Sequence, residues 1–157
     1  MNKLIISVVF ILFSLADSPA QIISYNISQI AELQRKEQRP VLIMLYTDWC
    51  RYCKAMENTT FKNEEIINQL NKVYYFLKFD AESKEEIVFQ GNTYSFVPTG
   101  KDTGLHELAE KIGRVDEQVN FPVLIFMNNQ LEVKHRSVGY IKASTLEKML
   151  ESFLRSN

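Results

Sequence analysis

A short apolar run that leads into a pair of cysteines constrains this chain more than any other feature. Residues 41–46 (VLIMLY) are continuously apolar, and only three residues separate them from Cys50. A run of this length without polar alternation is typical of a central strand that is buried on both faces. In α/β proteins, reactive groups lie beyond the carboxyl ends of such strands. The sequence therefore predicts an α/β fold with Cys50 and Cys53 at its functional edge.

Other segments continue this pattern of helices and strands. Asn26 and Gln29 form the signature of a capped helix start, and that helix must end before Pro40. Asn63 is expected to cap a helix that runs to Leu70. Apolar patterning predicts further strands at 73–79, 123–127 and 131–138, a short hairpin from 87–89 and 93–96, and a small helix at 105–113. A terminal helix is expected to bury Leu146, Met149, Leu150, Phe153 and Leu154. This order predicts a sandwich in which helices cover both faces of a sheet.

Composition narrows the classes of partner. The 157 residues carry 18 basic and 19 acidic side chains, for a net charge of −1. A chain so close to neutral offers no strong electrostatic case for binding nucleic acid or anionic lipid. Two cysteines are too few for a disulfide-framed mini-protein, and a domain of this length does not need such a frame. We therefore expect one ordinary domain whose cysteines serve chemistry.

The first twenty residues resemble a secretory signal peptide. Lys3 supplies a positive charge, residues 4–15 are apolar apart from two serines, and Ser18-Pro-Ala20 places small residues before Gln21. About 20 apolar residues are needed to span a bilayer, so this run is short for a membrane helix, although an uncleaved anchor is the alternative. We expect residues 1–20 to be removed, which leaves a mature domain at 21–157 without stable membrane insertion. Export would place both thiols in an oxidising compartment.

The spacing Cys50-Arg-Tyr-Cys53 suits thiol exchange. On a helix, residues three apart share one face, so the two sulfurs can join. The first sulfur would meet the unpaired amides and the positive dipole end of the helix, which favour a thiolate. In such motifs the pKa of the thiol falls from about 8.5 to ~3.5–7.5. We expect Arg51 to stabilise the thiolate of Cys50 further, and Cys53 to be the more buried, resolving thiol.

Two alternative interpretations of the cysteine pair remain open, an inert structural disulfide and a metal site. An inert disulfide would close a very small loop and would add little stability through chain entropy. A zinc site needs four ligands, and only His106 and His135 could add ring nitrogens, without paired spacing. His106 is expected to point away from the apolar face of its helix, as an exposed or capping residue, and His135 to lie on the surface of a strand. We therefore expect neither a metal nor an organic cofactor.

These residues resemble the thioredoxin superfamily. Trp49-Cys-Arg-Tyr-Cys-Lys54 follows an apolar strand, and Phe121-Pro122 precedes another strand about seventy residues later. The segments 46–50 and 53–57 are most similar to a secreted bacterial branch that includes the C-terminal domain of the membrane thiol:disulfide interchange reductase. The resemblance spans nearly all of residues 22–156. It implies a three-layer sandwich in which helices flank a central mixed β-sheet, with an insertion around residues 84–116.

The resemblance also implies roles for single residues. Cys50 matches the nucleophile of the family and Cys53 its resolving thiol. Trp49 matches an aromatic side chain beside the motif, and Pro122 matches a cis-proline whose loop faces the disulfide and pairs with a substrate strand. Phe121, just before it, would then shape the contact with substrate. A cis X-Pro bond is physically plausible there, because it makes a tight turn.

Four positions bear on the reactivity of the two thiols. Thioredoxins often hold a buried acid six residues before the first cysteine, where this chain has Met44. Glu57 matches an acid near the site in the interchange-reductase branch, so proton transfer would use Glu57, a water molecule or bulk solvent. The dipeptide between the cysteines is Arg51-Tyr52 and not the Gly-Pro common in reducing thioredoxins. The direction of the redox reaction therefore stays open.

Together these observations predict a periplasmic or secreted thiol–disulfide oxidoreductase, acting more as a reductase. Its partners would be protein substrates with disulfides or thiols, and a membrane redox partner that renews its electrons. One alternative is a disulfide oxidase or isomerase, which differs in redox potential. Another is a peptide-binding module that uses the Phe121-Pro122 groove and has only auxiliary thiols.

Overall fold

A mixed five-stranded sheet organises the part of the chain that this computed structural model describes, residues 21–156. The predicted signal peptide at 1–20 lies outside the described residues. The strand order is β1-β3-β2-β8-β9. Strands β1, β3 and β2 run parallel, β8 pairs antiparallel with β2, and β9 pairs antiparallel with β8, as predicted for a mixed sheet. The strands span β1 Ser24–Tyr25, β2 Val41–Tyr46, β3 Tyr75–Asp80, β8 Val123–Met127 and β9 Val133–Val138.

The apolar run at 41–46 is the central strand β2, with the bounds predicted from sequence. It pairs with β3 on one side and with β8 on the other, and five of its six residues are buried. Strand β3 begins at Tyr75, two residues later than expected, because Val73 completes the preceding helix and Tyr74 caps it.

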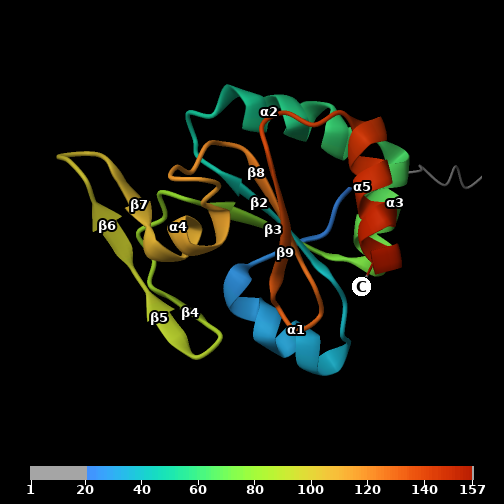
Figure 1. Ribbon diagram of the computed structural model, residues 1–157, viewed down its shortest axis with the longest axis horizontal. Coiled ribbons are helices and arrows are strands. Elements are labelled where there is room, and N and C mark those ends of the chain that lie inside the picture. Colours follow the sequence, from blue (N-terminus) through green and yellow to red (C-terminus); the bar gives the residue numbers. More distant parts are fainter. Residues whose placement is uncertain (1–20, 157) are drawn as a thin grey trace, which may run out of the picture.

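Helices cover both faces of the sheet, which confirms the predicted three-layer sandwich (Figure 1). Helices α2, α3 and α5 lie on one face, whereas α1 and α4 pack on the other. Asn26 caps the first turn with the predicted capping box, Asn63 caps α3, and Cys50 caps α2. The helical segments are η1 Ile27–Gln29, α1 Ile30–Lys36, α2 Arg51–Asn58, η2 Thr60–Lys62, α3 Glu64–Val73, α4 Glu107–Gly113 and α5 Ala143–Ser156.

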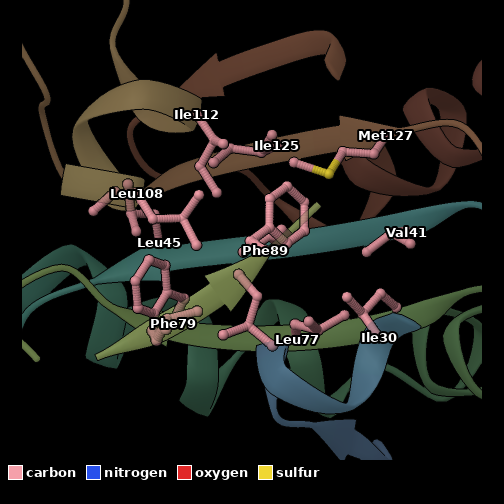
Figure 2. Close-up of a cluster of buried hydrophobic side chains, with 14 of the residues drawn as sticks. Ile30, Val41, Leu45, Leu77, Phe79, Phe89, Leu108, Ile112, Ile125 and Met127 are labelled. Carbon is pink, nitrogen blue, oxygen red and sulfur yellow. The ribbon is translucent and has the colours of Figure 1, made fainter. Parts of the chain in front are cut away.

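Each face of the sheet carries its own apolar core. On the α1 and α4 face, alternate residues of β2 meet side chains of β3, β8 and both helices, and Phe89 joins them from a hairpin (Figure 2). On the other face, Met44 and both cysteines pack with residues of α2, α3 and α5. Leu146, Leu150 and Phe153 of α5 are buried there, but Leu154 is exposed. Its predicted place in the core is therefore wrong, because it lies outside the apolar stripe of the helix.

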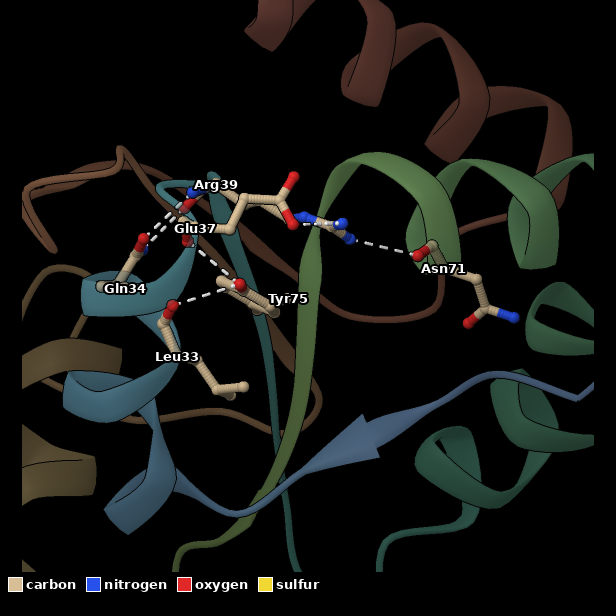
Figure 3. A network of polar contacts seen from close by, with 6 residues as sticks. All are labelled: Leu33, Gln34, Glu37, Arg39, Asn71 and Tyr75. Carbon is tan, nitrogen blue, oxygen red and sulfur yellow. Dashed lines mark hydrogen bonds and ion pairs between the residues drawn. The ribbon is translucent and has the colours of Figure 1, made fainter.

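A network of polar contacts connects the end of α1 to strand β3 and helix α3 (Figure 3). The hydroxyl of Tyr75 donates to the carbonyls of Leu33 and Glu37. Arg39 forms an ion pair with Glu37 at 2.6 Å and donates to the carbonyl of Asn71 on α3. These bonds hold the connection that enters β2, and so they fix the start of the central strand.

The segment predicted as an insertion around 84–116 forms two short hairpins followed by α4. The hairpins are β4 Ile87–Phe89 with β5 Asn92–Tyr94, and β6 Phe96–Pro98 with β7 Gly104–His106. The first was predicted, except that Phe96 belongs to the second hairpin, which was not predicted. Figure 1 places both hairpins on the same side as α4. Within residues 21–156, no helix combines the length and hydrophobicity required to cross a bilayer.

Candidate active site

The two cysteines form a disulfide at the amino end of α2. Cys50 is the N-cap residue and Cys53 lies in the first turn, so the sulfurs share one face as the spacing predicts. The backbone N–H of Cys53 donates to Sγ of Cys50 at 3.1 Å. One of the amides left unpaired at a helix start therefore points at the sulfur predicted to be the nucleophile.

Both cysteines are buried in this oxidised state. Cys50 exposes 4% of its surface and Cys53 exposes 1%, so their order agrees with the predicted roles, but Cys50 is far less open than we expected. Cys50 belongs to the apolar cluster that also contains Met44 and Met56, and this packing accounts for its low exposure.

Trp49, the residue before Cys50, is held by contacts on two sides. The residue is 65% exposed, and its ring packs edge-on against Phe121 with centroids 5.9 Å apart. Its Nε1–H donates to both carboxylate oxygens of Glu82, each at 3.1 Å. Phe121 is half-buried and also packs against the cluster that holds both cysteines. Two of the three residues predicted to bind substrate are thus in direct contact.

Pro122 follows a cis peptide bond, as the resemblance implies. Strand β8 begins at the next residue, and Val123 pairs with Leu45, so the cis-proline loop lies level with the carboxyl end of β2. The carbonyl of Pro122 already accepts from the N–H of Gly139 at 2.8 Å. Proline also lacks an N–H. Backbone pairing with a substrate strand would therefore depend on Phe121.

Glu57 pairs with a lysine that the sequence analysis did not single out. Its carboxylate lies 2.5 Å from Nζ of Lys78, and both side chains are about one-third exposed. Glu57 is four residues after Cys53 on α2, and residues at that spacing share a helix face. Lys78 also lies over the ring of Tyr46, 4.7 Å from its centroid. The arrangement brings a charged pair to the same side of the sheet as the resolving cysteine.

Arg51 and Tyr52 lie at the surface between the two cysteines. Tyr52 is 64% exposed, and Arg51 is the first residue of α2 and also exposed. Neither side chain packs into the core. Their predicted modulating roles therefore stay predictions, and only Arg51 carries a charge that could act on the sulfurs.

Acidic side chains gather on the loops next to Trp49. Burial raises the pKa of Asp80, the nearby charges of Asp48 and Glu82 raise it further, and a hydrogen bond from the backbone of Glu82 opposes the shift. Burial also raises the pKa of Tyr46. These carboxylates lie on segments that flank the carboxyl end of β2, and negative charge close to a thiolate would disfavour it.

The two histidines lie apart from this site. His106 is fully buried, where its Nδ1 accepts from the N–H of Leu108 and caps α4, and its ring packs against Phe79. Of the two predicted alternatives, exposed or capping, the structure confirms the capping one, and the residue is buried because its backbone pairs in hairpin β6–β7 and donates to the carbonyl of Ala81. His135 is exposed on β9, as predicted.

Sequence reasoning missed Glu82 and Lys78. Both belong to β3 or to the loop that follows it, and β3 runs parallel to β2. The carboxyl ends of parallel strands meet at one edge of a sheet, so Glu82, just after β3, could have been flagged as a neighbour of the Cys50 loop, whereas Lys78 inside the strand carried no such signal.

Comparisons with known proteins agree with this geometry. The sequence profile of the thioredoxin-like domain family matches residues 28–154. The thiol:disulfide interchange protein DsbD of Campylobacter jejuni (strain RM1221) is 26% identical over 128 residues, which cover 80% of this chain but 18% of that relative. The chain therefore spans about a fifth of the length of this curated relative.

Two solved structures share the fold. A Bacteroides thetaiotaomicron protein, provisionally described as a disulphide-isomerase, has a TM-score of 0.61 and 23% identity, with 89% of this chain and 98% of that chain covered. The reduced C-terminal domain of Neisseria meningitidis DsbD has a TM-score of 0.51 and 17% identity, with coverage of 83% and 91%. The family profile together with the Cys50–Cys53 pair supports the predicted enzyme class, a thiol–disulfide oxidoreductase. Because the profile covers most of its length, the chain belongs to the thioredoxin-like domain family.

Proposed function

We propose that this protein is a periplasmic thiol–disulfide oxidoreductase that reduces disulfides in other proteins. The observation that carries the proposal is the Cys50–Cys53 disulfide at the amino end of α2, beside an exposed tryptophan and the cis-proline loop. A structural staple would need none of these neighbours.

In the proposed reaction, the thiolate of Cys50 attacks one sulfur of a substrate disulfide. The substrate S–S bond breaks, a mixed disulfide forms, and the other substrate sulfur leaves as a thiolate that takes up a proton. Cys53 then loses its proton and attacks Sγ of Cys50, which releases the second substrate thiol and leaves the Cys50–Cys53 disulfide. Two electrons pass to the substrate, and no organic cofactor or metal is needed.

The local geometry supports Cys50 as the nucleophile. The N–H of Cys53 already points at Sγ of Cys50, and a charge-assisted hydrogen bond of this kind stabilises a thiolate. Cys53 is the more buried sulfur and can be reached by Cys50 but hardly by a second protein. We assign Cys50 the attack on substrate and Cys53 the resolving step.

The direction of transfer is inferred from charge. Thiolates are disfavoured by the carboxylates of Asp48, Asp80 and Glu82, so the dithiol state is less stable and gives up its electrons more readily. Arg51 acts in the opposite sense but is exposed to solvent, which screens its charge. The balance favours a reductase over an oxidase or isomerase.

Substrate would lie along Trp49 and the cis-proline loop. Phe121 offers backbone groups for an extended segment, and Trp49 with Phe121 offers apolar surface beside the disulfide. Tyr52 is exposed on the other side of Cys50 and would contact the same partner. A disulfide on a flexible surface loop of another protein fits this arrangement.

Location and electron supply complete the proposal. We infer that residues 1–20 direct export and are removed after Ala20, because they have the charge, length and small residues of a signal peptide. In an oxidising compartment a reductase needs renewed electrons, and we propose that a membrane redox partner supplies them to the Cys50–Cys53 disulfide. Amino-terminal sequencing of the protein recovered from the periplasm tests the cleavage site.

Trapping of mixed disulfides tests the enzyme directly. Cys53→Ala should accumulate complexes in which Cys50 is bonded to a substrate cysteine, and these complexes should dissociate on reduction. The double variant Cys50→Ser/Cys53→Ala is the matched control and should trap nothing. If Cys50→Ser captures partners and supports function as well as the native protein, the peptide-binding alternative replaces this proposal.

The redox potential separates the remaining alternatives. Equilibration with glutathione gives the potential of the Cys50–Cys53 couple. A value near about −270 mV, the level of thioredoxin, is expected for a reductase, whereas a value near about −120 mV is that of a strong oxidant. A potential at the oxidising end would overturn the proposed direction and leave the thiol chemistry intact.

A further inference from the structure

The contact between Trp49 and Glu82 is unusual for two side chains at a protein surface. A two-thirds exposed indole ordinarily has solvent around its N–H, but this one donates to both oxygens of a single carboxylate. Hydrogen bonds to an ionised acceptor are stronger than neutral ones. Glu82 is therefore placed to hold the indole in one orientation.

Glu82 is itself held by the turn that follows β3. Its N–H donates to Oδ1 of Asp80 at 3.0 Å, and the N–H of Ser83 donates to the carbonyl of Asp80 at 3.1 Å. The N–H of Ala81 donates to the carbonyl of Tyr46 at 2.8 Å, which fastens the turn to the end of β2. The carboxylate of Glu82 therefore projects from a turn that hydrogen bonds hold in place.

On its other side the indole meets the cis-proline loop. The ring of Trp49 packs edge-on against Phe121, so three segments far apart in sequence converge on one side chain. These segments are the β2–α2 loop, the turn after β3 and the residue before Pro122. The β2–α2 loop leads to the nucleophile Cys50, and the residue before Pro122 offers the proposed substrate-pairing backbone. The turn after β3 contributes Glu82 to the contact with Trp49.

We propose that Glu82 is a positioning residue that fixes Trp49 as one wall of the substrate groove. This inference deepens the proposed function and rests on it. A wall that is ordered before substrate arrives spares the complex the loss of side-chain freedom on binding, so Glu82 acts on affinity for protein substrates. It does not touch the reacting sulfurs, so the rate of the chemical step is not its main effect.

The experiment uses the fact that Trp49 is the only tryptophan of the chain. Its indole N–H gives a single signal in a ¹⁵N–¹H spectrum, and solvent exchange of that proton reports the bond to Glu82. The full-length mature protein is compared with Glu82→Ala, with Glu82→Gln, which keeps a neutral acceptor, and with the control Glu86→Ala. Glu86 is exposed on the same connection. Thermal melting establishes that each variant is folded.

In the oxidised protein, Glu82→Ala should speed exchange of the indole proton at least threefold. With insulin as the protein disulfide and dithiothreitol to regenerate the reduced protein, the KM of Glu82→Ala for insulin should rise roughly threefold to tenfold, which corresponds to the loss of one hydrogen bond, while kcat stays within twofold. Glu82→Gln should fall between Glu82→Ala and the native protein, and Glu86→Ala should match the native protein in both measurements.

Two results would overturn the inference. Unchanged indole exchange in Glu82→Ala would show that the carboxylate does not hold the ring. A fall in kcat with KM unchanged would place Glu82 in the chemistry and not in the groove. If the native protein reduces no insulin, the proposed function fails, and the indole exchange alone then decides whether Glu82 fixes Trp49.

Discussion

Lys78 lies opposite Met44 in the register of β3 and β2, on the face of the sheet that carries the disulfide. An acid at residue 44 would have been the direct neighbour of this lysine. With methionine there, the Nζ of Lys78 pairs instead with Glu57, which reaches it from α2 at 2.5 Å. The charged pair thus spans from the sheet to the helix that bears both cysteines.

This arrangement predicts a kinetic role for Glu57. We expect Glu57→Gln to slow the attack of Cys53 on a mixed disulfide roughly tenfold at neutral pH, because the variant removes the carboxylate nearest in sequence that can accept the thiol's proton. The step is measured by rapid mixing of the reduced protein with a small activated disulfide. The first step, attack by Cys50, should change far less.

The stability of Glu57→Gln separates a kinetic role of Glu57 from a structural one. The Glu57–Lys78 pair is partly exposed, so its loss should lower the free energy of unfolding by no more than about 1 kcal/mol. Glu151→Gln is the matched control, since it removes an exposed ion pair to Arg155 on α5. Equal resolving rates in the two variants would count against a role for Glu57.

The raised pKa of Asp80 predicts how stability changes with pH. Burial, with the charges of Asp48 and Glu82, favours the protonated carboxyl in the folded state. The ionised form therefore destabilises the fold above the folded-state pKa, and this loss is relieved as the pH falls from that value towards the lower unfolded-state value. Asp80→Asn removes the charge and keeps an oxygen that can accept from the N–H of Glu82.

We expect Asp80→Asn to be more stable than the native protein at pH 7, by less than about 1 kcal/mol because solvent screens a half-exposed carboxyl. Urea unfolding at a series of pH values measures the difference. The advantage of the variant should shrink steadily on acidification. An advantage that is independent of pH would mean that the charge of Asp80 is not its source.

Local signals in the sequence predicted most of the elements. The run at 41–46, the caps Asn26 and Asn63, and the placement of Cys50 at a helix start each depend on neighbours within a few residues, and the structure contains all of them. The cis bond before Pro122 came from the family resemblance and not from local pattern.

The remaining features depend on contacts between distant segments. Glu82 becomes relevant only because β3 lies parallel to β2, and Lys78 only because α2 crosses the sheet above it. Hairpin β6–β7 closes through pairing across a five-residue loop that carries no apolar pattern. The burial of His106 was missed for the same reason, since it contacts segments distant in sequence, at Phe79 and Ala81.

The buried ring of His106 is expected to stabilise the fold. Its ring caps α4 through Leu108 and also bonds to the carbonyl of Glu85 through Nε2. His106→Ala removes both contacts and leaves a cavity beside Phe79, so the free energy of unfolding should fall by about 2–4 kcal/mol. His106→Asn keeps an N-cap acceptor and should lose less. Chemical denaturation of the two variants checks this order, and equal losses would exclude the cap as a contributor.

Replacing Gly113, the last residue of α4, by alanine has two opposing effects on stability. Alanine favours a helix over glycine by up to about 1 kcal/mol, which by itself would stabilise Gly113→Ala. The added Cβ, however, would lie 2.3 Å from Cδ2 of Leu45, a fully buried residue of the central strand. Overpacking of a core commonly costs about 1–3 kcal/mol, so the clash should prevail and the variant should lose roughly 1–2 kcal/mol.

Gly100→Ala is the control for Gly113→Ala. Its Cβ would come within 2.7 Å of Oγ1 of Thr103, but both residues are exposed on the tip of hairpin β6–β7, where the threonine side chain can turn away. Its melting temperature should stay close to that of the native protein. Because Leu45 lies two residues before Thr47 and the loop to Cys50, Gly113→Ala should also loosen that loop. Faster alkylation of the reduced cysteines in Gly113→Ala than in Gly100→Ala would reveal this effect, and equal rates would confine the strain to the core.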